Sequence, residues 1–195
     1  TGITSGLIKF RIAIVMLAVF VIRGAALEGP KCMASLGELG DLGINQAFIC
    51  TLAAALTITF LTIKKVPAST SQSIVGSIVG ATLIASQPNW LQFLKMVICW
   101  VFTPIGGAII SYILYRSFEF AISSRIKSTR KLQRFLKVTM VFAGCYGSYA
   151  LGANNVANTT GIYVNTGMIG PLHASLIGAV AIVLGAATYS HKVMD

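Results

Sequence analysis

Residues 152–161 read GANNVANTTG and place three asparagines and two threonines between two apolar stretches. The stretch before them, residues 138–151, reads VTMVFAGCYGSYAL, and the stretch after them, residues 168–187, reads MIGPLHASLIGAVAIVLGAA. Polar side chains deep in apolar territory are costly unless they meet a partner, so they mark either a ligand site or hydrogen bonds between helices. The composition of the whole chain indicates whether these apolar stretches belong to a soluble core or to a membrane protein.

The composition is that of a membrane protein. Hydrophobic residues make up 55% of the chain and charged residues only 10%, whereas a soluble domain carries about 25% charged residues. The apolar runs are long and uniform and do not alternate with a period of two, which favours helices over barrel strands. The sequence therefore predicts an all-α, polytopic transmembrane helical bundle.

Positive charge is concentrated in one segment. Seven of the fifteen Lys and Arg residues lie between Arg116 and Lys137, in a chain of net charge +10. Basic residues massed in a short segment between membrane spans indicate the cytoplasmic side. We therefore expect a cytoplasmic basic loop over 116–137 and no nucleic-acid partner. Binding of a phospholipid or of a protein by this loop stays open.

The two ends of the chain resemble each other. With a shift of 161 residues, Gly6–Met33 lies over Gly167–Met194, and ten of the 28 positions are identical. Shared apolar composition is the alternative explanation. Five candidate membrane crossings separate equivalent points of the two copies. An odd number of crossings places the second copy upside down relative to the first. Inverted repeats with interrupted helices are the architecture of many secondary transporters. The predicted organisation is a first repeat over 1–115, the basic loop over 116–137 and a second repeat over 138–195. The first copy lacks an asparagine segment, so we expect an internal piece of a longer protein.

A second polar segment, VPASTSQS, spans residues 66–73. Pro67 permits a turn, and Ser69, Thr70 and Ser71 are good caps for a helix that begins here. Their hydroxyls and the free backbone N–H groups of a helix start would bind an oxyanion such as phosphate without an intramembrane cation. An ordinary capped helix is the alternative.

The asparagines are candidate cation ligands. Asn154 and Asn158 share a face if the segment is helical, and an unwound turn would add backbone carbonyl groups as ligands for Na⁺. Hydrogen bonding between helices is the alternative role for Asn154, Asn155 and Asn158.

GANNVAN closely resembles the GANDVAN signature of the inorganic phosphate transporter family of secondary transporters. VPASTSQSIVGSIVGA is similar to that family's PVSTTHAIVGAIVGA segment, and the similarity extends through nearly the whole chain. The resemblance implies two inverted repeats, each with one signature and one re-entrant Ser/Thr hairpin, and import of phosphate with Na⁺ or H⁺. It also implies phosphate-binding residues (Ser69, Thr70, Ser71 and Gln72) and cation-binding residues (Asn154, Asn155 and Asn158), which could share in holding phosphate.

Two positions depart from the family pattern. Asn155 stands where the family usually has Asp, and Gln72 stands where it often has His. A neutral Asn155 cannot relay a proton, and no acid of the chain lies in the middle of an apolar run. Because a proton relay needs an ionisable group inside the membrane, we favour Na⁺ symport of phosphate. The alternatives are a permease for H⁺-coupled phosphate or for another oxyanion such as sulfate, and a phosphate receptor that does not transport.

The expected ligands are inorganic phosphate and a co-transported cation, Na⁺, with no further cofactor or metal. We expect no enzymatic activity. The expected location is the plasma membrane, with the helices in contact with the lipid bilayer. If the chain acts without further segments, we expect it to pair with a second copy, as a homo-oligomer, or with a partner.

Overall fold

The computed structural model describes residues 10–125 and 128–194, and within them the chain forms α-helices and no strand. In chain order the helices are α1 (Phe10–Gly37), α2 (Ile44–Ile63), α3 (Thr70–Ala85), α4 (Trp90–Arg125), α5 (Thr129–Asn165) and α6 (Pro171–Met194). The start of the predicted repeat at residues 6–9 lies outside the described residues, as do residues 126–127 and Asp195. The all-α prediction is confirmed.

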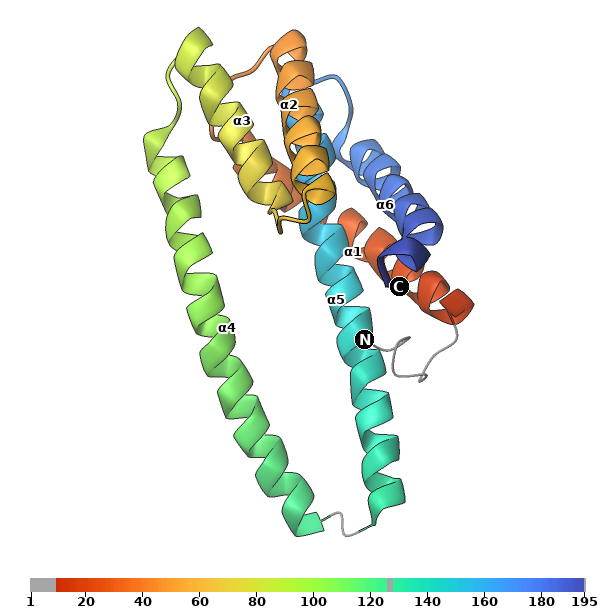
Figure 1. Cartoon of the computed structure of the whole chain (residues 1–195). Coiled ribbons are helices and arrows are strands. Elements are labelled where there is room, and N and C mark those ends of the chain that lie inside the picture. The colour runs from red at the N-terminus through yellow and green to blue at the C-terminus, as the bar shows by residue number, and fades with distance from the viewer. Residues whose placement is uncertain (1–9, 126–127, 195) are drawn as a thin grey trace.

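Among the described helices, four are long and apolar enough to cross a membrane: α1, α2, the Trp90–Phe120 part of α4 and the Pro171–Thr188 part of α6. With 16 residues, α3 is too short, because a helix rises about 1.5 Å per residue and the hydrocarbon core is about 30 Å thick. Most of α4 lies apart from the other helices and exposes large apolar side chains such as Phe102 and Ile109 (Figure 1). The prediction of a polytopic integral membrane protein is confirmed.

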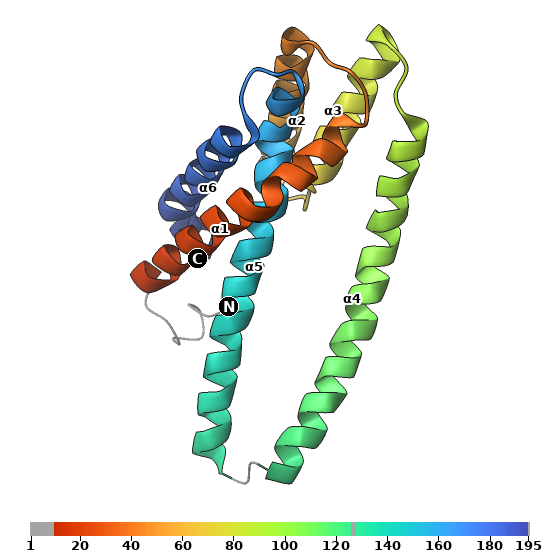
Figure 2. The same cartoon turned by 180° about the vertical axis from the view of Figure 1, so that it is seen from behind.

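The backbones of α1 and α5 touch where the two helices cross (Figure 2). A Cβ atom placed on Gly24 would lie 2.0 Å from the carbonyl oxygen of Tyr149, and one placed on Gly152 would lie 2.1 Å from that of Val21. Only glycine fits at either position, and such small residues let helices approach closely within membranes. Gly152 is the first residue of the GANNVAN motif, so this glycine is required for the packing of α5 against α1.

α6 completes a three-helix unit with α1 and α5. Its buried residues are small (Ala174, Ser175 and Ala179), and its Gly178 faces Val156 of α5. α1 and α6 lie side by side and run in opposite directions (Figures 1 and 2), which is the arrangement that an inverted repeat requires. The repeat relationship itself stays a prediction.

α2 and α3 form an antiparallel hairpin whose turn, residues 64–69, lies beside the middle of α5 (Figure 1). Lys65 in this turn adopts a left-handed conformation with φ of 56°. The Sγ atom of Cys50 donates to the carbonyl oxygen of Ser77 at 3.4 Å and links the two arms of the hairpin. The hairpin carries the Ser/Thr segment at its turn, and its re-entrance into a membrane stays a prediction.

The structure differs from two expectations about where helices end. The basic segment 116–137 is mostly helical and not a loop, because α4 continues to Arg125 and α5 begins at Thr129. Straight-chain residues, which dominate its second half, keep their side-chain freedom in a helix and so favour it. The asparagine segment is not unwound or interrupted either, since α5 runs through it without a break. Thr160 donates its hydroxyl to the carbonyl oxygen of Val156 at 2.9 Å, and the polar side chains that project from α5 find partners on α3.

Candidate functional site

The Ser/Thr segment forms the start of α3. Ser69 is the N-cap residue, and its Oγ accepts a hydrogen bond from the backbone N–H of Gln72 at 3.3 Å. The N–H of Ser73 bonds to the carbonyl oxygen of Ser69 at 3.1 Å. The backbone N–H groups of Thr70 and Ser71 belong to the first helical turn, where no intrahelical acceptor exists. They therefore remain available to a ligand, as the sequence predicts for an anion site.

The asparagine segment presents its side chains from the middle of α5. Asn154 is exposed, Asn155 is half-buried and Asn158 is 7% exposed. Because α5 is a continuous helix, Asn154 and Asn158 lie one turn apart on one face, as predicted for a helical segment.

The two polar segments meet directly, although about 85 residues separate them in the sequence. The hydroxyl of Thr70 donates to Oδ1 of Asn155 at 2.9 Å. Nδ2 of Asn158 donates to Oγ of Ser71 at 2.7 Å and lies 3.5 Å from Oδ1 of Asn155. Two predicted phosphate-binding residues, Thr70 and Ser71, and two predicted cation-binding residues, Asn155 and Asn158, thus form one polar cluster.

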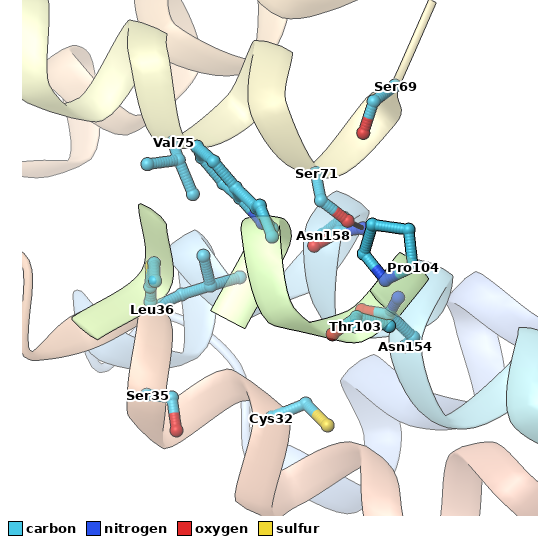
Figure 3. A pocket seen from close by; sticks show the side chains of 12 residues that line it. Cys32, Ser35, Leu36, Ser69, Ser71, Val75, Thr103, Pro104, Asn154 and Asn158 are labelled. Atoms are coloured by element: carbon cyan, nitrogen blue, oxygen red, sulfur yellow. Dashed lines mark hydrogen bonds between the residues drawn. The ribbon is translucent and has the colours of Figure 1, made fainter. Parts of the chain in front are cut away.

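Two open cavities flank this cluster. A cavity of about 470 Å³ lies on the side of α1 and α4 and includes Ser69, Ser71, Asn154 and Asn158 in its lining. Figure 3 shows Ser71 beside Asn158 on one side of it, with Ser35 and Cys32 of α1 on the other. A second cavity of about 490 Å³ is lined by residues that include Thr70 and Asn155. Either is large enough for a tetrahedral oxyanion with water.

Gln72 has a smaller part than the sequence predicts. Its side chain is exposed, and it lines neither of the two cavities. Its contact with the cluster is the backbone hydrogen bond to Ser69. The structure therefore places Ser69, Thr70 and Ser71 at the cavities, and places the Gln72 side chain away from them.

The lining of the cavity beside α1 and α4 also contains residues that the sequence analysis did not single out. Cys32 and Ser35 come from α1, and Trp100 and Thr103 come from α4. Cys32 and Ser35 lie near the C-terminal end of α1, which continues to Gly37. Thr103 is a single hydroxyl in an apolar run. No local signal distinguishes these residues, because they reach the site through the packing of α1 and α4 around it.

The cavity linings are neutral. Among the described residues that line either cavity, none is an Asp, Glu, Lys, Arg or His, and Cys32 is the one side chain that can titrate. The site can therefore offer hydroxyl and amide donors to an anion, or hydroxyl and amide oxygens to a cation. Within the described part of the chain, no group of three or more His, Cys, Asp or Glu side chains could hold a metal ion.

The sequence model of the phosphate transporter family matches residues 1–141 and 122–195 and so extends over the whole chain. The chain belongs to the phosphate transporter family. The resemblance in the two polar motifs is thereby confirmed at the level of the family, and the family consists of transporters and not of enzymes, as the sequence predicts.

Relatives within the phosphate transporter family include proteins named for different anions. The sulfate permease CysP of Bacillus subtilis is 29% identical over 98% of this chain and 55% of its own length. The inorganic phosphate transporter 2-1, chloroplastic, of Arabidopsis thaliana is 31% identical over 60% of this chain and 22% of its own length. A permease of Methanocaldococcus jannaschii is 25% identical over all of this chain and 60% of its own length. The chain thus spans little more than half of CysP and of the M. jannaschii permease.

A solved structure has the same fold. The sodium-dependent phosphate transporter superposes on all of this chain, and on 70% of its own chain, with a TM-score of 0.78 at 20% sequence identity. At this identity the superposition shows the fold.

Proposed function

We propose that the chain forms part of a secondary transporter that imports inorganic phosphate together with Na⁺. The observation that carries this proposal is the joining of the two polar segments by the Thr70–Asn155 and Ser71–Asn158 hydrogen bonds at the edge of open cavities. Membership of the phosphate transporter family supports phosphate as the substrate. Phosphate and the cation would be the only ligands, with no further cofactor.

The start of α3 suits an anion. Two backbone N–H groups of its first turn have no intrahelical partner, and the helix dipole adds a partial positive charge there. The hydroxyls of Ser69 and Ser71 add donors beside the same cavity. Phosphate would bind here through neutral donors, so that no cation of the protein has to be buried.

The asparagines suit a hard cation. The amide oxygens of Asn154 and Asn158 are neutral ligands of the kind that Na⁺ and other hard cations take, whereas that of Asn155 already accepts from Thr70. A proton-coupled mechanism would need a titrating group in the membrane, and the described lining offers only a thiol. The sodium dependence of the transporter that shares this fold supports the same choice of cation.

Import of phosphate against a negative interior requires cations for energetic reasons. Each charge that crosses against 100 mV costs about 2.3 kcal/mol. A phosphate dianion therefore needs at least one, and more favourably two, Na⁺ ions to enter. The proposed location is the plasma membrane, with the basic ends of α4 and α5 on the cytoplasmic side, as their positive charge favours.

The test is uptake of labelled phosphate by proteoliposomes that contain the protein expressed from its complete gene. An imposed Na⁺ gradient should drive accumulation, and Ser71→Ala should reduce it at least about tenfold, since a lost hydrogen bond to a charged ligand is worth about 1.5–3 kcal/mol. Ser117→Ala is the matched control, because the Ser117 hydroxyl is exposed on α4 and bonds only within its own helix. Accumulation driven by an H⁺ gradient alone would refute the Na⁺ role, and bound phosphate without accumulation would indicate a receptor.

A sulfate permease is the second candidate function. The observation that favours it is the similarity to CysP, which extends over 98% of this chain.

A further inference from the structure

The hydrogen bonds within the polar cluster leave mainly donor groups available to a ligand. Oδ1 of Asn155 receives the Thr70 hydroxyl at 2.9 Å, and Nδ2 of Asn158 lies 3.5 Å from the same oxygen. An amide oxygen has two lone pairs, so both are occupied by these donors. The part of Asn155 that remains for a ligand is its NH₂ group, which donates.

Ser69 and Ser71 also accept hydrogen bonds from the protein and keep a donor for a ligand. Oγ of Ser71 accepts from Asn158 at 2.7 Å, and Oγ of Ser69 accepts from the backbone N–H of Gln72 at 3.3 Å. Each serine oxygen already accepts one hydrogen bond, and its O–H remains free to donate to a ligand. With the free N–H groups at the start of α3, the cluster presents mainly donors.

Among the described lining residues, none supplies a carboxylate that would accept a proton from the ligand. Hydrogen phosphate carries a P–OH group that must donate to an acceptor, whereas sulfate carries four oxygens that only accept. A site with an acceptor placed for the hydroxyl of phosphate would reject sulfate, which has no hydroxyl. A site without that acceptor has no basis for rejecting sulfate. The donor set therefore gives hydrogen phosphate no advantage over sulfate, a tetrahedral anion that carries no proton.

We propose that this site takes tetrahedral dianions and accepts sulfate as readily as hydrogen phosphate, with Asn155 as the residue that sets this selectivity. The proposal rests on the proposed transport function and deepens it. A carboxylate at this position would still accept from Thr70, would have lone pairs left for a P–OH group, and would repel a ligand that has no proton to share.

The experiment measures inhibition of labelled phosphate uptake by unlabelled sulfate and by unlabelled phosphate, in proteoliposomes of the protein expressed from its complete gene. The two inhibition constants should agree within about tenfold in the unaltered protein. Asn155→Asp should shift their ratio toward phosphate by about 100-fold, because the substituted carboxylate favours the protonated anion and repels sulfate. Asn89→Asp is the matched control, since it adds the same charge at the start of α4, where Asn89 accepts from the N–H of Gln92 at 3.2 Å and Asp caps equally well.

The outcomes separate the two proposals. Phosphate uptake that is insensitive to a large excess of sulfate would overturn the selectivity proposal and leave phosphate transport standing. Uptake of neither anion would overturn the transport proposal. An unchanged ratio in folded Asn155→Asp would remove the role of Asn155.

A second measurement needs no variant. Between pH 8 and pH 6 phosphate gains a proton and sulfate does not, so inhibition by phosphate should weaken relative to sulfate as the pH falls. Among the described lining residues, none is a carboxylate or an imidazole whose charge would change across this range. Inhibition by phosphate that strengthens on acidification would contradict a site for dianions.

Discussion

Replacing Gly152 by alanine tests whether the backbone contact between α1 and α5 organises the fold. The added methyl carbon would lie 2.1 Å from the carbonyl oxygen of Val21, at least 0.9 Å inside the 3.0 Å below which such contacts essentially do not occur. The obstacle is backbone on a packed helix, so α1 has to move away as a unit. Gaps of that size forfeit a quarter to a half of the dispersion attraction between the facing atoms.

The expected magnitude follows from two opposing effects. Overpacking against a rigid neighbour costs about 3 kcal/mol, at the upper end of the usual range, while alanine in place of glycine favours the helix by about 1 kcal/mol. Gly152→Ala should therefore destabilise the protein by about 2 kcal/mol, which lowers the melting temperature by about 4–8 °C for a chain of this length.

Thermal unfolding of the purified protein in detergent measures this loss. Gly147→Ala is the matched control, because Gly147 lies on the same helix and a Cβ there would meet nothing within 4 Å. It should leave stability unchanged or raise it by about 1 kcal/mol. A melting temperature for Gly152→Ala equal to or above that of the unaltered protein would refute the proposed backbone contact.

Three further predictions concern buried polar groups and the cavity. Ser175 is fully buried and its Oγ has no hydrogen-bond partner among the described residues; Ser175→Ala should stabilise the protein by about 1 kcal/mol in thermal unfolding, and a loss of stability would mean that the hydroxyl is bonded. Ser71→Ala and Asn158→Ala should be non-additive, with a coupling energy of about 1 kcal/mol in a double-mutant cycle on unfolding, and additive effects would contradict their hydrogen bond. Cys32 lines the cavity beside α1 and α4, whereas Cys50 is buried on α2 away from it, so bound phosphate should slow alkylation of Cys32 and leave Cys50 unaffected; equal protection of both would point to a global change in place of occupancy of the cavity.

The sequence predicts the class of the protein and the residues of the polar cluster more securely than it predicts their geometry. Apolar runs define the membrane helices because burial in lipid requires them, and the Ser69–Ser71 and Asn154–Asn158 segments stand out because polar groups are rare there. Their meeting is a tertiary contact over 85 residues, suggested in advance only by the family resemblance.

What the sequence could not give depends on packing. The contributions of Cys32 and Thr103 to the cavity arise from how α1 and α4 lie, and neither residue stands out in its own segment. The continuity of α5 was also hidden, because asparagines favour turns when alone, and the partners that satisfy Asn155 and Asn158 come from α3.

The two walls of the candidate site are held by contacts of very different stiffness. The α5 wall follows within one turn of Gly152, whose backbone contact with α1 can change only if two helices separate. The α3 wall is joined to α5 by the side chains of Thr70 and Ser71, and each such hydrogen bond contributes about 1 kcal/mol net. Both bonds can hold while the remaining donors of the cluster meet a ligand. If the cavity has to widen around an anion, α3 should therefore move before α1 does.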